Sequence, residues 1–219
     1  MDIIGVIFDF NGTMIFDRQY HLDAWRECVE DITMREMSRA DVLNHIDGKG
    51  PREILEHFLG EGLSDAMILQ FAEEKERIYR SMLLKNRLPL APGLETFLDY
   101  LSNARIPMAI ASSATPENME LYYDEYELFR WFDEDHILSP SEDTPAKPHP
   151  ALYEKAIQAL KLPARYCIAF EDAGVGIEAA YAAGIRNIIH VSTDMPGSFD
   201  ETPPGVIRTI RDYTELKEF

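Results

Sequence analysis

The chain has 219 residues, of which 39 are acidic and 21 are basic, so its formal net charge is −18. This length fits one large domain, or one domain that carries a smaller insertion, and a hydrophobic content of 46% is ordinary for a globular protein. The excess of acidic residues weighs against nucleic acid and against an anionic membrane surface, because both attract clustered Lys and Arg. We therefore expect neither partner.

The cysteines and the first residues of the chain indicate its surroundings. Cys28 and Cys167 stand among apolar neighbours and are too few for a disulfide framework, so buried free thiols are expected. Residues 1–9 contain neither the basic segment of a signal peptide nor an apolar run long enough to span a membrane. These features predict a protein of the reducing cytoplasm.

Short β-branched, apolar runs alternate with helical patterns along most of the chain, which is typical of parallel βαβ units with helices on both faces of the sheet. In chain order, strands are expected at residues 3–9, 106–111, 166–170 and 185–191, with an edge strand at 206–210. Helices are expected at residues 94–101, 151–160 and 175–183, with a closing helix at 213–219. The pattern predicts an α/β fold.

The stretch from residue 17 to residue 87 interrupts this alternation, because it shows several amphipathic helical patterns and no convincing strand. A segment rich in Pro and Gly, residues 88–93, then marks the return to the α/β pattern. We therefore predict a parallel-sheet core domain formed by residues 1–16 and 88–219, with an all-helical domain of residues 17–87 inserted after the first strand.

Polar residues follow several of these elements, and ligands of open parallel sheets bind beyond the carboxyl ends of the strands. Four segments carry these residues: Asp9-Phe10-Asn11-Gly12-Thr13, Ser112-Ser113, Lys147-Pro148-His149-Pro150 and Glu171-Asp172. Taken singly, each has an ordinary structural role as a helix cap, a turn or a surface charge. Their order along the chain predicts that they converge at one edge of the sheet.

The chemistry of these side chains suits phosphoryl transfer. A carboxylate such as Asp9 can attack phosphorus and form an acyl phosphate, and Asp9 together with Asp172 can hold Mg²⁺. Ser112 can donate a hydrogen bond to a phosphoryl oxygen, and Lys147 can neutralise negative charge shared by Asp9 and the phosphate. Gly12 permits a tight turn that aims backbone N–H groups at the phosphate.

The four segments resemble the four motifs of the haloacid dehalogenase superfamily. Residues 171–180, with the sequence EDAGVGIEAA, are similar to the fourth motif of its β-phosphoglucomutase-like subfamily of sugar-phosphate phosphatases and mutases. Tyr20-His21 and Ala24-Trp25 resemble the start of the helical cap of that subfamily. The resemblance covers essentially the whole chain, and it implies a Rossmann-like parallel-sheet core domain with an inserted all-helical cap domain.

The resemblance implies a Mg²⁺-dependent phosphohydrolase of a small phosphorylated metabolite, in which Asp9 is the nucleophile. It implies that Mg²⁺ binds to Asp9, to Asp172 and to the backbone carbonyl of Asn11, with Glu171 supporting these ligands. Ser112 and Lys147 would bind the transferring phosphoryl group, and Ser113 is counted with them. The expected substrate is a sugar phosphate, and the expected assembly is a monomer or a homodimer.

One position departs from the pattern of the family. Its phosphatases and mutases carry a second Asp two residues after the nucleophile, which protonates the leaving group and later activates water. Here the residue is Asn11, whose amide does not titrate near neutrality. Loss of general acid–base catalysis typically costs ~10²–10⁴ in rate. The amide can still orient a water or a leaving group by hydrogen bonding.

Several explanations of Asn11 stay open. The protein is a slow phosphatase in which another group or water moves the proton, or it acts on substrates with good leaving groups, such as acyl phosphates. It resembles phosphonoacetaldehyde hydrolase, with Lys49 as the Schiff-base lysine although the local spacing matches poorly, or it is a catalytically weak protein that binds a phosphorylated metabolite. Deamidation at Asn11-Gly12 would regenerate an Asp.

Two further activities are disfavoured. A β-phosphoglucomutase-like mutase would need efficient proton handling on two hydroxyl groups, which an amide does not supply. A dehalogenase is disfavoured because Glu171 and Asp172 retain the metal-binding pattern.

We expect the cap domain to determine which substrate binds. In residues 47–53, glycines flank Lys49, which suits a loop tip, and Arg52 at the start of the next helix can hold a second anionic group. His21 is the third candidate for contact with the substrate. The alternative for Lys49 and Arg52 is solvated surface charge, and for His21 it is a structural role within the cap.

Overall fold

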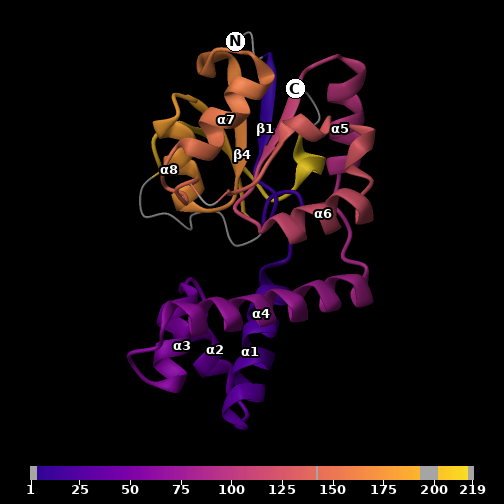
Figure 1. Cartoon of the computed structure of the whole chain (residues 1–219). Helices are drawn as coiled ribbons and strands as arrows, with labels where there is room; N and C mark the ends of the chain where they lie inside the picture. Colours follow the sequence, from indigo (N-terminus) through magenta and orange to yellow (C-terminus); the bar gives the residue numbers. More distant parts are fainter. Residues whose placement is uncertain (1–3, 142, 193–201, 217–219) are drawn as a thin grey trace. The chain divides into compact units, whose positions relative to one another are not determined.

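The computed structural model describes residues 4–141, 143–192 and 202–216. The chain divides into two compact units, one formed by Met1–Phe16 with Pro89–Phe219 and the other by Asp17–Leu88. Figure 1 shows the helices of the second unit in indigo to purple, and the α/β unit in magenta, orange and yellow except for its first strand, which is also indigo. Leu88, expected from the sequence to lie in the core domain, falls in the helical unit.

The α/β unit is built on a six-stranded sheet in the order β3-β2-β1-β4-β5-β6, in which every pairing is parallel. Its strands are β1 (Gly5–Phe8), β2 (Met108–Ala111), β3 (Ile137–Leu138), β4 (Cys167–Glu171), β5 (Asn187–Val191) and β6 (Val206–Ile210). Five of these strands were expected, although Ile3 of the first predicted run lies outside the described residues. The sixth, β3, has only two residues and therefore leaves no periodic pattern in the sequence.

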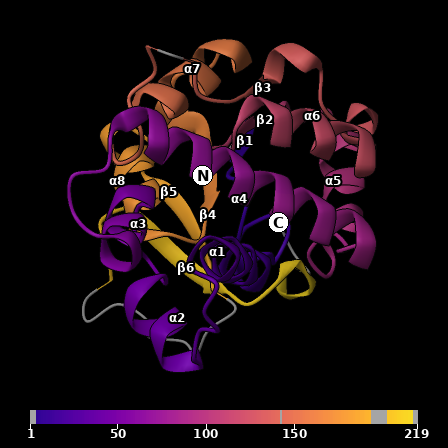
Figure 2. The ribbon, with the colours of Figure 1, turned by 60° about the horizontal axis from the view of Figure 1, so that its bottom comes forward.

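Helices cover both faces of this sheet, as Figures 1 and 2 show. They are α5 (Leu94–Asn103), α6 (Pro116–Glu125), α7 (Ala151–Leu160) and α8 (Gly174–Ala182), joined by the short 3-10 helices η1 (Leu128–Arg130), η2 (Glu134–His136), η3 (Ala164–Tyr166) and η4 (Tyr213–Glu215). The α/β fold with a parallel sheet is thus confirmed. The expected closing helix is wrong for residues 213–215, which form a single 3-10 turn; residues 217–219 lie outside the described part.

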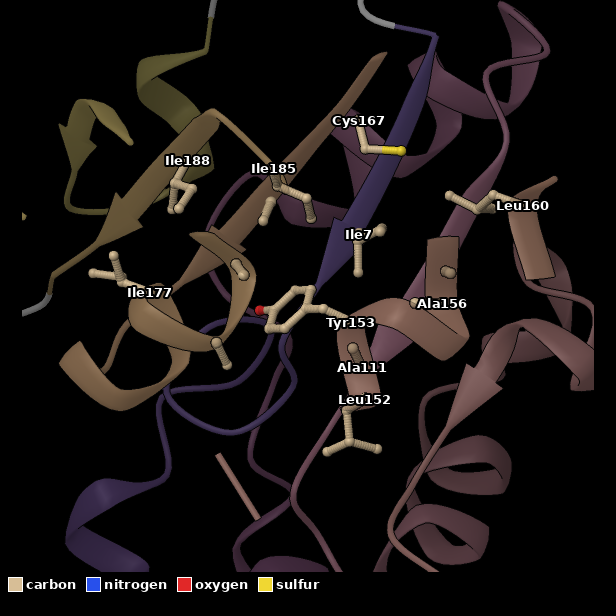
Figure 3. Packing of buried hydrophobic residues seen from close by; sticks show 14 residues of the cluster. Ile7, Ala111, Leu152, Tyr153, Ala156, Leu160, Cys167, Ile177, Ile185 and Ile188 are labelled. Carbon is tan, nitrogen blue, oxygen red and sulfur yellow. The ribbon is translucent and has the colours of Figure 1, made fainter. Parts of the chain in front are cut away.

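The central strand β1 has no exposed side chains and packs differently on its two faces. On one face, Ile7 joins a cluster with residues of α7 and α8, which Figure 3 shows around the ring of Tyr153. On the other face, the Phe8 ring stacks on Phe170 with centroids 5.1 Å apart and lies edge-on to Phe97 of α5. A sheet covered on both faces has continuous apolar strands, which is why these runs could be recognised.

The helical unit contains α1 (Arg18–Thr33), α2 (Arg39–His45), α3 (Pro51–Leu59) and α4 (Asp65–Asn86). Ser38 and Ser64 cap α2 and α4, because each hydroxyl accepts a hydrogen bond from a backbone N–H of the first turn. Its own apolar core includes Trp25, Ile54 and Leu55. The unit has no strand in the part that the structure describes.

Two further expectations concern the whole chain. Cys28 and Cys167 are both free and buried, as predicted. Within the described ranges, none of the helices combines the length and the apolar character that crossing a bilayer requires.

Candidate active site

The carboxyl ends of the neighbouring strands β1 and β4 bring three acidic residues together. Asp9 directly follows β1, and its backbone N–H donates a hydrogen bond to the carbonyl of Phe170 at 2.9 Å. Glu171 is the last residue of β4, and Asp172 follows it. One carboxylate oxygen from each of Asp9, Glu171 and Asp172 lies within 4.8 Å of the others. The predicted convergence of these residues is therefore present in the structure.

Lys147 lies between two of these carboxylates. Its Nζ is 2.5 Å from Asp9 Oδ1 and 2.6 Å from Glu171 Oε1, and its side chain is only 7% exposed. The hydroxyl of Tyr153, on α7, donates a hydrogen bond to the same Glu171 oxygen at 2.7 Å, and its ring lies 5.1 Å from the Lys147 Nζ. Lys147 and Tyr153 thus hold Glu171 from two sides, while Lys147 also orients the Asp9 carboxylate.

Burial and mutual charge shift the pKa values of this cluster. Burial raises the pKa of Asp9 well above its usual range, and the charges of Glu171 and Asp172 add to this rise while Lys147 opposes it. Burial by itself lowers the pKa of Lys147, but Asp9 and Glu171 outweigh it, so the net shift is upward. Lys147 therefore stays protonated at neutral pH, and its ammonium contacts two of the three acidic side chains.

The turn after Asp9 is shaped around Asp172. Gly12 has a φ of +75°, and a Cβ at this position would collide with the Asp172 carboxylate. The Thr13 hydroxyl is 3.4 Å from Asp172 Oδ1, and His190 Nε2 is 3.1 Å from the Asp172 carbonyl oxygen. Glycine is thus required at position 12 both for its backbone conformation and for the close approach of Asp172.

The two serines after β2 differ in their surroundings. β2 pairs with β1, so Ser112 lies at the same edge of the sheet as Asp9. Ser112 is completely buried, and its Oγ accepts a hydrogen bond from the Ala114 N–H at 3.1 Å. Ser113 is exposed. Ser112 therefore lies at the predicted edge of the sheet, and the phosphate-binding roles predicted for both serines stay predictions.

The Asn11 side chain has a partner that was not expected. Its Nδ2 donates a hydrogen bond to the hydroxyl of Tyr122, on α6, at 2.8 Å. The ring of Tyr122 stacks on Phe10 with centroids 4.4 Å apart. Tyr122, Tyr153 and His190 were all missed in the sequence, where no motif marks any of them.

The candidate residues of the helical unit all have partners within that unit. His21 Nε2 lies 3.1 Å from Asp17 Oδ2, its ring stacks on Tyr79 at 4.0 Å, and its Nδ1 accepts a hydrogen bond from the Lys75 Nζ at 2.7 Å. Lys75 is 4% exposed, and no sequence pattern marked it out. His21, itself half-buried, therefore belongs to a polar cluster with the buried Asp17 and Lys75.

Lys49 and Arg52 lie in surface ion pairs of the same unit. Lys49 Nζ is 2.6 Å from Glu53 Oε1, and the Arg52 guanidinium bridges Glu56 at 2.8 Å and Asp65 at 2.5 Å. Such exposed pairs contribute little to stability. The substrate contacts expected of Lys49, Arg52 and His21 stay predictions.

The parallel sheet, the lysine-bridged carboxylate cluster at its carboxyl edge and the helical unit inserted after the first strand are the features that the resemblance to the haloacid dehalogenase superfamily implied. The chain belongs to the haloacid dehalogenase-like hydrolase family, whose family model matches residues 3–184. The resemblance found in the motifs is thereby confirmed, as is the prediction of an enzyme.

Curated relatives and a solved structure agree with this assignment. The β-phosphoglucomutase of Bacillus subtilis is 30% identical over 189 residues, which cover 83% of this chain and 80% of that protein. The fructose-1-phosphate phosphatase YqaB of Escherichia coli is 28% identical over 181 residues, covering 83% and 93%. The crystal structure of a family IA hydrolase from Entamoeba histolytica is 33% identical, with a TM-score of 0.89 and coverage of 97% and 94%.

Tyr153→Phe is expected to lower the free energy of unfolding by about 1.5–3 kcal/mol, because it removes a hydrogen bond to a buried charged group. The measurement is urea denaturation at neutral pH. Tyr166→Phe, which removes a hydroxyl from a half-buried tyrosine of η3, serves as the matched control. Equal losses in the two variants would show that the Tyr153 hydroxyl does not support Glu171.

Proposed function

We propose that the protein is a Mg²⁺-dependent phosphohydrolase of a small phosphorylated metabolite, with Asp9 as the nucleophile and an aspartyl phosphate as the intermediate. The observation that carries this proposal is the buried cluster in which Lys147 bridges Asp9 and Glu171, with Asp172 within 4.8 Å. We propose a phosphorylated sugar as the substrate, because two relatives are named as a phosphoglucomutase and a fructose-1-phosphate phosphatase.

The donor set of the cluster fits Mg²⁺. Three ionised carboxylates and one ammonium would leave a local charge of about −2, and that excess repulsion is one cause of the raised pKa of Asp9. Mg²⁺ is bound by a few carboxylate oxygens together with waters and substrate oxygens. Asp9, Asp172 and the backbone carbonyl of Asn11 would hold it, with Glu171 beside them. A bound Mg²⁺ would offset the charge of the carboxylates and of the phosphoryl group.

The side chains of the cluster account for each part of phosphoryl transfer except the proton. An oxygen of Asp9 forms a bond to phosphorus, and the bond from phosphorus to the leaving oxygen breaks. The ammonium of Lys147 stabilises the negative charge that gathers on the phosphoryl oxygens. Ser112 supplies a hydrogen-bond donor at the same edge. Water then displaces Asp9 from phosphorus and releases inorganic phosphate.

Asn11 determines which substrates react well. Since the amide cannot protonate a leaving oxygen, that oxygen must depart as an anion or take its proton from water. Alkyl phosphates such as sugar phosphates should therefore be hydrolysed slowly, and substrates with stable leaving groups, such as acyl phosphates, more rapidly. The same lack disfavours a mutase, which must move protons on two hydroxyl groups.

The alternative function is that of a phosphometabolite-binding protein with little turnover. The observation that favours it is that position 11 carries an amide, which does not titrate near neutrality and is hydrogen-bonded to Tyr122. This alternative keeps the phosphate-binding and metal-binding roles of Lys147 and Asp172. It predicts thermal stabilisation by a phosphorylated ligand without release of phosphate.

We expect metal-dependent release of inorganic phosphate in a screen of sugar phosphates, acetyl phosphate, p-nitrophenyl phosphate and phosphonoacetaldehyde. Removing the metal with EDTA should lower the rate by about a hundredfold or more, because a divalent cation contributes several kcal/mol of charge stabilisation. Added Mg²⁺ should restore the rate. A rate that is the same with EDTA and with Mg²⁺ would refute the metal-dependent mechanism, and binding without release would favour the alternative.

A further inference from the structure

Tyr122 holds the two residues that follow the nucleophile. Its hydroxyl accepts the hydrogen bond from Asn11 Nδ2 at 2.8 Å, and its ring stacks on Phe10 with an angle of 12° between the ring planes. Phe10 and Tyr122 are both completely buried. One side chain of α6 therefore anchors both Phe10 and Asn11, and through them the turn that carries Asp9.

The surroundings of Tyr122 hold its hydroxyl in place. Its helix, α6, begins with a cap in which Thr115 Oγ1 accepts a hydrogen bond from the Asn118 N–H at 3.3 Å. The ring of Tyr126, the residue that follows α6 as its C-terminal cap, lies 5.9 Å from Phe10 and 6.3 Å from Tyr122. A buried ring with these neighbours has one favoured rotamer, so the hydroxyl is a stationary partner for Asn11.

A carboxamide has two unlike ends, and in the structure the nitrogen is the end that faces Tyr122. Because Nδ2 points to Tyr122, Oδ1 lies at the opposite end of the amide. The oxygen has two lone pairs, so it can accept a hydrogen bond from water in addition to any protein donor. An amide oxygen can orient an attacking water without removing its proton.

We infer that Tyr122 is a positioning residue, which orients the Asn11 amide so that Oδ1 aligns the water that hydrolyses the phosphorylated Asp9. This inference depends on the proposed phosphohydrolase activity. In the step, the water oxygen forms a bond to phosphorus and the bond from phosphorus to Asp9 breaks. Asp9 leaves as a carboxylate, and both water protons remain with the released phosphate until it exchanges them with solvent. Asn11 takes neither proton.

The test separates formation of the phosphorylated enzyme from its hydrolysis. With p-nitrophenyl phosphate, the initial burst of p-nitrophenolate reports the attack by Asp9, and the steady rate reports the hydrolysis. Tyr122→Phe should lower the steady rate about five- to tenfold, the effect of one hydrogen bond, and leave the burst rate within about twofold. Tyr126→Phe removes another buried hydroxyl, at the C-terminal cap of α6, and should leave both rates within about twofold of the unmodified protein.

A second comparison distinguishes positioning from mere support of α6. In an Asn11→Asp background the two carboxylate oxygens are alike, so no hydrogen bond is needed to choose between them. Tyr122→Phe should then cost about twofold or less in the steady rate. If Tyr122→Phe lowers the steady rate by the same factor in the unmodified protein and in Asn11→Asp, Tyr122 acts only through packing and the inference is wrong.

A spectroscopic measurement keeps the inference testable without turnover. The side-chain amide of Asn11 gives a ¹⁵N–¹H signal pair that Asn11→Asp removes, which assigns it. We expect Tyr122→Phe to shift this pair and speed its exchange with water, while Tyr126→Phe does neither. An unchanged pair would overturn the positioning role. Complete inactivity of the unmodified protein on every substrate, with the pair shifted as expected, would instead refute the proposed function.

Discussion

Asn11→Asp is expected to raise the rate of sugar-phosphate hydrolysis by about 10²–10⁴, the usual contribution of a general acid and base. The new carboxyl group would supply both the proton for the leaving oxygen and the base for the attacking water. Position 11 suits this exchange, since Asn and Asp have the same shape and the backbone carbonyl is retained. Tyr122 also suits it, because a phenol hydroxyl can donate to a carboxylate as readily as it accepts from an amide.

The size of this gain should depend on the leaving group. An acyl phosphate or p-nitrophenyl phosphate has a leaving group that needs little protonation. The attack of Asp9 on these substrates should therefore gain much less from Asn11→Asp than the attack of Asp9 on a sugar phosphate. The measurement is kcat/KM for each substrate at saturating Mg²⁺. Asn11→Ala is the control, and it should bring no gain. Equal rates of the Asn and Asp proteins across all the phosphate esters would show that proton transfer does not limit this enzyme.

The fraction of the protein that carries an intact Asn11 must be known before these rates are compared. An Asn followed by a Gly deamidates readily, and a small fraction of Asp at position 11 would account for all the activity of a preparation if Asn11→Asp were many times faster. Peptide mass spectrometry of the active sample measures this fraction. An activity that stays constant while the fraction of intact Asn11 varies between preparations would exclude deamidation as its source.

Asp9→Asn is expected to reduce turnover of every substrate by more than about 10⁴-fold, because the amide cannot form the acyl phosphate. Loss of folding should not explain this result. Burial and the charges of Glu171 and Asp172 raise the pKa of Asp9, which means that its ionised form destabilises the folded protein. The neutral amide avoids this destabilisation. Lys147 keeps its ion pair with Glu171.

Two measurements complete this prediction. Thermal unfolding of Asp9→Asn should occur at or above the temperature of the unmodified protein in the absence of Mg²⁺. Acid-quenched protein mixed with ³²P-labelled acetyl phosphate should carry a labelled acyl phosphate in the unmodified chain and none in Asp9→Asn. Label that remains in Asp9→Asn, or turnover within tenfold of the unmodified protein, would show that Asp9 is not the nucleophile.

The strand pattern was predictable because a parallel sheet covered on both faces needs continuous apolar runs. β1, β2, β4 and β5 all carry this signal, and their burial is complete in the structure. β3 has two half-buried residues and no such signal. α6 was not recognised either, because its acidic residues are interspersed with its few apolar ones and leave no clear apolar face.

The carboxylate cluster was predictable for a related reason. Strands of a parallel sheet end at the same edge, so Asp9 and Asp172 had to lie close together once β1 and β4 were neighbours. Lys147 was among the residues predicted to lie at this edge, but the tyrosine partner of the cluster was not predictable. Tyr153 lies one helical turn into α7, and its contact with Glu171 depends on how α7 packs against the sheet.

The sequence by itself determined the α/β class, the helical insertion and the acidic residues at the sheet edge, because these follow from local periodicity and from the direction of parallel strands. Only the tertiary structure decided what surrounds Asn11 and His21. Asn11 meets Tyr122 across 111 positions of the chain, and His21 meets Lys75 across 54. Such pairings depend on side-chain packing between elements far apart in sequence, which no local pattern encodes.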